Sequence, residues 1–93
     1  MIQLPAKRKG AEVVLPSGSF ARCRPITVED VYLSSQNPGM LATIMLAVRC
    51  VALDDRPLTL DDVLAMEWAD FRPISAMLDR QLAATDRTKD GVA

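Results

Sequence analysis

The chain of 93 residues contains no histidine, and this absence excludes much of ordinary enzyme chemistry. Histidine is the commonest general base near neutral pH, the usual partner of serine and cysteine nucleophiles, and a frequent zinc ligand. Only two cysteines are present, Cys23 and Cys50, too few for the disulfide framework of a small secreted domain. We therefore expect two buried free thiols, no metal site, no cofactor and no enzyme activity.

Long hydrophobic runs are missing as well. The longest apolar stretch, 40–53, is interrupted by Thr43 and Arg49 and is too short to cross a bilayer. The first residues lack the layout of a signal peptide. With 49% hydrophobic and 25% charged residues, the composition is that of one globular domain. We expect a cytoplasmic protein that is not secreted and does not bind a membrane.

Charge is unevenly distributed, although the net charge is only −1. Residues 1–24 hold five basic residues and one acidic residue, which gives +4, and the remainder therefore carries −5. A basic end is a feature of nucleic-acid-binding proteins, but here Phe20 is the only aromatic residue within it. No recognition-helix pattern follows, so the sequence disfavours a nucleic-acid role. A small regulatory DNA-binding module is an alternative function, and its only support is the basic charge of residues 1–24.

The most informative pattern is a phrase that occurs twice, at 25–31 and at 57–63. In each copy a threonine, Thr27 or Thr59, precedes an acidic first turn, as expected for a helix N-cap. Asp30 and Asp62 stand three residues later, in the position of the acid of a capping box. The two phrases predict two helix starts and carry no catalytic chemistry.

The rest of the chain predicts an α+β domain that is mainly α. A flexible arm over 1–10 leads into a β-hairpin over 12–24, whose strands flank a Pro/Gly turn. Four helices, two of them short, are expected at 28–35, 39–52, 60–66 and 71–84, and a disordered tail at 85–93. A break before 71 places Pro73 in the first turn of the last helix, where it is tolerated.

Partner-binding residues are expected on the helices, because the 39–52 helix is apolar nearly all round. The methionines of the helical stripes either fill the core or grip varied apolar partners. Trp68 either anchors the helix junction or is an exposed interface anchor. The candidates for the partner site are Met40, Ile44, Met45, Met66, Trp68, Phe71 and Met77. Self-association of the chain through the same residues is the alternative to binding a different partner.

Four segments in this order resemble a known family. They are a strand pair around the turn at 15–18, the helix start at 24–27, the segment Leu-Thr-Leu-Asp-Asp-Val-Leu-Ala-Met at 58–66, and the Ala-Asp-Phe step at 69–71. Together they resemble the small tail assembly chaperones of contractile-tailed bacteriophages and prophages. The likeness spans about residues 12–82 and rests on helix caps and core positions.

This resemblance implies a non-catalytic protein in the cytoplasm of a bacterial host. Such chaperones bind the tape measure protein and keep its hydrophobic helical segments soluble before the tail tube assembles. The physical mode would be capture of an amphipathic helix on an apolar surface. A small structural baseplate or tail component that is retained in the virion is the alternative, with the same apolar residues forming a permanent interface.

Overall fold

The computed structural model describes the backbone of residues 10–92 and the side chains of residues 10–83. Strands β1 (Ala11–Val14) and β2 (Phe20–Cys23) are followed by helices α1 (Val28–Ser34) and α2 (Met40–Cys50). Strands β3 (Val51–Leu53) and β4 (Arg56–Pro57) come next, and then helices α3 (Leu60–Ala65) and α4 (Trp68–Val92). The expected fold class, α+β and mainly α with an N-terminal hairpin and four helices, is confirmed.

The sheet is larger than the predicted hairpin. It has four strands in the order β1-β2-β3-β4, and every neighbouring pair is antiparallel. The expected helix over 39–52 ends at Cys50, and the chain continues directly as β3, where Cys23 is paired with Val51. Within the apolar run nothing marks this change, so pairing with β2 decides it and not local propensity. A two-residue turn at Asp54 and Asp55, both with positive φ, returns the chain as β4.

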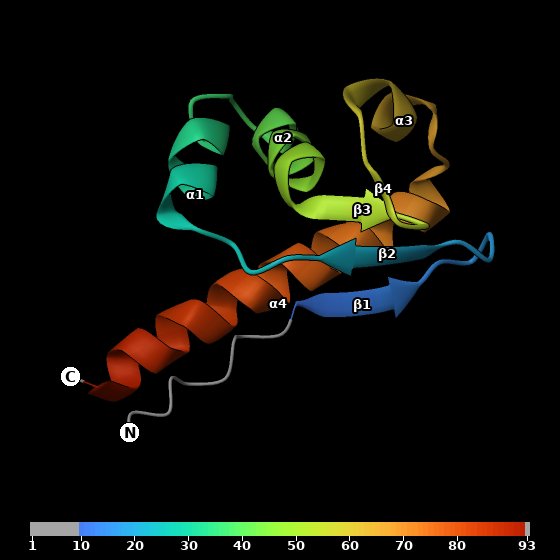
Figure 1. The fold of residues 1–93 in the computed structure, drawn as a ribbon. Coiled ribbons are helices and arrows are strands. Elements are labelled where there is room, and N and C mark those ends of the chain that lie inside the picture. The colour runs from blue at the N-terminus through green and yellow to red at the C-terminus, as the bar shows by residue number, and fades with distance from the viewer. Residues whose placement is uncertain (1–9, 93) are drawn as a thin grey trace.

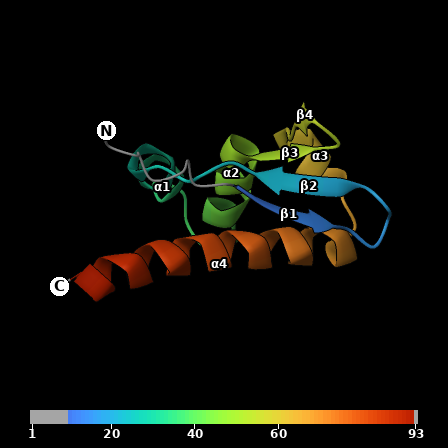
Figure 2. The ribbon, with the colours of Figure 1, turned by 60° about the horizontal axis from the view of Figure 1, so that its bottom comes forward.

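Helix α4 runs along one face of the sheet and supplies one side of the core (Figure 2). Its apolar residues at helical spacing face the core: Phe71, Ile74, Met77 and Leu78 are buried, and Leu82 packs against them. They meet the small inward residues of β2, Ala21 and Cys23, together with residues of α2 and the 58–63 segment. Both cysteines are buried and free, as expected.

The start and end of α4 differ from the prediction. The helix begins at Trp68, three residues before the expected start, and Asp70 is not its N-cap. The Asp70 carboxylate instead accepts a hydrogen bond from the Ser17 backbone N–H at 3.1 Å, which ties the β1–β2 turn to α4. Pro73 therefore lies inside the helix. At the other end the helix continues to Val92 through the expected disordered tail, because no proline or glycine precedes Gly91 there. Residues 1–9 of the expected arm over 1–10 lie outside the described residues.

The three shorter helices stand in a row. Figures 1 and 2 both show α1, α2 and α3 in that order along the length of α4, and α2 contacts both of its neighbours. In the described part of the chain no helix is long and apolar enough to cross a membrane. The fold thus places α1 and α3 at either side of α2, each with one side free of the core.

Candidate functional site

Both repeated phrases form complete capping boxes, as predicted. Thr27 accepts from the Asp30 N–H while the Asp30 carboxylate accepts from the Thr27 N–H, and Thr59 and Asp62 do the same. The two acids then differ in their surroundings. Asp30 is fully buried, whereas Asp62 is partly exposed. The same local sequence therefore starts a helix at both places, but only at Asp30 does it also anchor that helix to the core.

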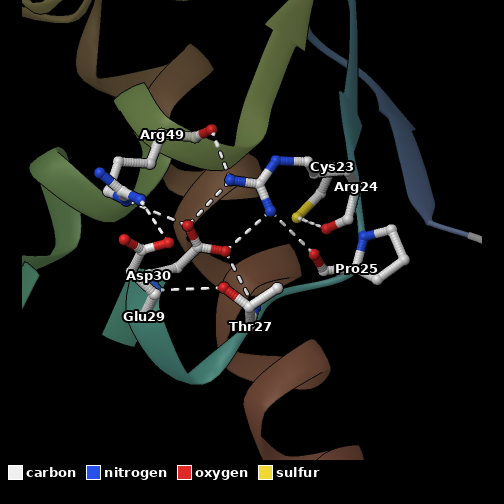
Figure 3. A network of polar contacts seen from close by, with 7 residues as sticks. All are labelled: Cys23, Arg24, Pro25, Thr27, Glu29, Asp30 and Arg49. Atoms are coloured by element: carbon white, nitrogen blue, oxygen red, sulfur yellow. Dashed lines mark hydrogen bonds and ion pairs between the residues drawn. The ribbon is translucent and has the colours of Figure 1, made fainter. Parts of the chain in front are cut away.

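Two arginines neutralise the buried Asp30 carboxylate (Figure 3). Arg24, just after β2, donates two hydrogen bonds to it at 2.7 and 2.8 Å, and Arg49 of α2 donates one at 3.0 Å. Arg24 also donates to the Arg49 carbonyl oxygen at 3.1 Å. These bonds lower the pKa of Asp30 far below its usual range and raise that of Arg24, so that all three groups are charged. This ion cluster joins α1, α2 and the end of β2.

Helix α1 is consequently inverted relative to an ordinary amphipathic helix. Its buried residues are polar, Asp30 and Ser34, which are four positions apart and so share a face. The buried Ser34 hydroxyl has no hydrogen-bond partner among the described residues. The large apolar residues face solvent instead, with Val28 86% and Tyr32 62% exposed. A helix attached through charges leaves its apolar side available for a partner.

Two further exposed hydrophobic residues, Met40 and Leu41, begin the neighbouring helix α2. We use the name α1–α2 surface for the exposed hydrophobic residues of these two neighbouring helices: Val28, Val31, Tyr32, Leu33, Met40 and Leu41. Val28, Val31 and Tyr32 have the i, i+3, i+4 spacing that places side chains along one side of a helix. Exposed apolar patches of this kind mark interaction sites when they are contiguous.

A second group of exposed hydrophobic residues lies at the other side of α2. Leu60 and Leu64 are one turn apart on α3, and Trp68 opens α4 after a turn at 66–67. We use the name α3 surface for these three residues. The Trp68 ring lies 6.0 Å from the Phe71 ring, centroid to centroid, so the indole rests against the edge of the core while 56% of the residue is exposed.

The structure distributes the seven predicted partner-site residues over different environments. Met40 belongs to the α1–α2 surface and Trp68, with its exposed ring, to the α3 surface. Ile44, Met45 and Met66 are half-buried, and Ile44 and Met66 pack against the core. Placing Phe71 and Met77 at a partner surface was wrong, because both are buried in the core on the inner side of α4. Helical spacing identified the stripe correctly but could not show which element covers it.

The most exposed residues of the α1–α2 surface, Val28 and Tyr32, are not among the seven predicted residues. The signal was present: Asp30 and Ser34 share one side of α1, and Val28, Val31 and Tyr32 share another. An apolar side normally predicts the buried face. Only the positions of Arg24 and Arg49, which lie on other elements, reverse this orientation.

Among the described residues no group of histidine, cysteine or acidic side chains could hold a metal ion. Burial raises the pKa of the Cys50 thiol to about 12 and also raises that of Cys23, which makes both poor nucleophiles. A hollow of about 450 Å³ lies beside these cysteines. Both cysteines line it, together with the two arginines of the ion cluster. Its charged groups are all engaged, because Arg24 and Arg49 bind Asp30 and Arg22 contacts Glu12 and Asp55.

Comparison with known proteins found no matching family model, no similar curated protein and no similar solved structure.

Proposed function

We propose that this protein is a non-catalytic tail assembly chaperone of a phage or prophage, which binds hydrophobic helical segments of the tape measure protein and keeps them soluble before the tail tube assembles. The observation that carries the proposal is the inverted helix α1, whose apolar residues face solvent while Asp30 and Ser34 face the core. The proposal also draws on the order of helix caps and core positions that resembles this family.

The α1–α2 surface has the chemistry required to bind an apolar helix. Its residues on α1 follow helical spacing, so they form a ridge that can pack against the side chains of a second helix. The only charged residue on the outward part of α1 is Glu29, which lies 4.0 Å from Arg49. A neutral surface accepts different apolar segments, and Met40 adds a side chain that adapts its shape.

The expected affinity of this surface is modest. Full burial of a large apolar side chain contributes about 1.5–3 kcal/mol, so burying the exposed parts of six such residues contributes roughly 6 kcal/mol. Loss of translational and rotational freedom on association costs about 4–15 kcal/mol. Binding through this surface alone is therefore weak, which suits a chaperone that must release its client when the tube assembles.

The arginines in the described part of the basic end, and Arg49 beside them, offer little support for the DNA-binding alternative. Arg24 and Arg49 are engaged with Asp30, and Arg22 contacts Glu12 at 2.8 Å and Asp55 at 3.4 Å. These arginines are partly neutralised and are not arranged as an open phosphate-binding patch. The balance favours a protein partner.

The direct test is co-expression with helical segments of the tape measure protein encoded beside this chain, followed by affinity pull-down and a solubility assay. We expect the client segment to become soluble and to co-purify. The variants Tyr32→Glu and Met40→Glu should abolish capture, because each places a charge within the apolar contact. Val14→Glu is the matched control, since Val14 is 72% exposed but lies on the hairpin.

Four results would contradict the proposal. The client could stay insoluble, or the two α1–α2 variants could capture it as well as Val14→Glu does. The third is recovery of the protein in stoichiometric amounts from purified phage particles, which would instead identify a structural tail component. Light scattering of the free protein at increasing concentration shows whether a second copy covers the α1–α2 surface, which would also count against client binding there.

A further inference from the structure

The α3 surface differs from the α1–α2 surface in its charge. Residues 54–70 contain six acidic residues and one basic residue, Arg56, which gives a net charge of −5. Four of these acids have partners: Asp62 is in its capping box, Asp54 accepts from the Phe20 N–H, Asp70 accepts from the Ser17 N–H, and Asp55 contacts Arg22.

The two remaining acids of this segment are neighbours in the sequence of residues of the α3 surface. Asp61 follows Leu60, and Glu67 precedes Trp68; both acids are exposed. Neither forms an ion pair within the described part of the chain. The α3 surface therefore combines three exposed hydrophobic side chains with two uncompensated negative charges.

We infer that the α3 surface binds a segment of the client in which lysine or arginine residues flank apolar ones, an inference that rests on the proposed function. Leu64 and Trp68 provide the apolar contact, and Asp61 and Glu67 provide opposite charges at its rim. Rim charges of this kind accelerate encounter and exclude segments of the wrong charge. The α1–α2 surface supplies apolar contact without a preference for the charge of the client segment. The α3 surface adds the selection for basic segments.

A second copy of this chain does not fit as the occupant. In a symmetric dimer the same patch of both protomers meets at the axis, so Asp61 and Glu67 of one protomer would face those of the other. Like charges brought together at an interface disfavour the complex. An acidic or neutral client segment lacks the complementary charge, which leaves the basic amphipathic segment as the occupant.

The chain contains its own reporter for this test, because Trp68 is its only tryptophan. Two synthetic helical peptides serve as probes, with identical apolar sides and with either lysine or glutamate on the polar side. We expect the lysine peptide to shift Trp68 emission to shorter wavelength as it covers the half-exposed indole. It should bind about tenfold more tightly than the glutamate peptide at low ionic strength, and most of this difference should disappear in 0.5 M salt.

The variant Asp61→Asn/Glu67→Gln tests the charges and leaves Trp68 in place. It should reduce the preference for the lysine peptide about threefold to tenfold. Asp79→Asn is the matched control, since it removes a charge that is also exposed but lies on α4, outside both named surfaces. Leu64→Ser should weaken both peptides equally, because it removes apolar contact alone. Cooperative urea unfolding of each variant verifies that it is folded.

Equal affinity for the two peptides would overturn the inference, as would an undiminished lysine preference in the double variant. Salt-sensitive self-association of the free protein, accompanied by the same Trp68 shift, would assign the surface to a second copy and would also overturn it. The proposed function fails separately, if the wild-type protein cannot solubilise its client. Conversely, the client could be soluble with the wild-type protein and bind equally well to the double variant and to Leu64→Ser. That result refutes only the assignment of the α3 surface.

Discussion

The substitution Asp30→Asn removes the charge at the centre of the ion cluster while keeping the shape of the side chain. The carboxylate accepts three hydrogen bonds from Arg24 and Arg49 and one from the Thr27 N–H. An amide has one acceptor oxygen, and its NH₂ group would point toward a guanidinium donor. The variant therefore loses the charge-assisted bonds and places two donors against each other.

The expected cost follows from the exposure of the three side chains. Breaking a buried ion pair by removing one partner costs about 3–5 kcal/mol. The arginine side chains left behind are 46% and 31% exposed, so water can hydrate them and the cost falls toward the lower end. We expect a loss of about 3 kcal/mol in the free energy of unfolding. Arg24→Met should cost more, because it leaves the carboxylate, whose side chain is 1% exposed, without its main partner.

Urea unfolding monitored by circular dichroism measures this loss as a lower midpoint at unchanged slope. The control is Asp62→Asn, which disrupts the same capping box in the second copy of the repeated phrase but touches no arginine. The difference between the two variants isolates the arginine contacts from the cap. A loss below about 1 kcal/mol for Asp30→Asn, or equal losses for the two variants, would refute the role assigned to the cluster.

The same cluster predicts how stability depends on pH. The folded state lowers the pKa of Asp30 far below its ordinary value of 3.8, so the unfolded chain binds this proton more readily. The stabilisation is therefore complete above about pH 5 and is lost as the pH falls through the acid range. Wild-type stability measured from pH 6 to pH 2.5 should decline more steeply than that of Asp30→Asn. Parallel curves would contradict the assignment.

Three further changes have expected outcomes. Gly10→Ala would place a methyl carbon 1.9 Å from the Cys23 carbonyl oxygen, so thermal unfolding should show a loss of about 1–3 kcal/mol, whereas an unchanged midpoint would contradict this close approach. Asp55→Gly should raise stability by about 1 kcal/mol, because Asp55 has a φ of +68° in the β3–β4 turn; a lower melting temperature would count against it. A thiol reagent should label Cys50 in the native protein far more slowly than in urea, since a pKa of about 12 instead of 9.0 reduces the thiolate fraction about a thousandfold; equal rates would show that the thiol is accessible.

Local sequence signals were sufficient for much of the fold. Thr27 and Thr59 determine the starts of α1 and α3 through bonds within four residues, and such bonds form wherever the segment lies. The apolar stripe of α4 and the turn at 15–18 are local in the same sense. These features could be predicted because each depends on neighbours in the sequence.

The remaining features depend on contacts between distant residues. Strand β3 continues the apolar run of α2 without a break, and only pairing with β2 and β4 makes it a strand. The acidic pair at 54–55 is the two-residue turn that could have indicated the β3–β4 hairpin. The outward direction of α1 depends on Arg49, which is 19 positions from Asp30 along the chain. Apolar spacing alone favours the opposite orientation.

The inverted helix has a consequence for sequence variation. In most helices the same apolar residues both support folding and limit which substitutions the domain tolerates, so a new specificity costs stability. Here the two requirements are divided between opposite sides of α1: Asp30 attaches the helix to the domain, and Val28 and Tyr32 are free of that task. Residues on the outward side can therefore diverge while the domain that carries them stays the same.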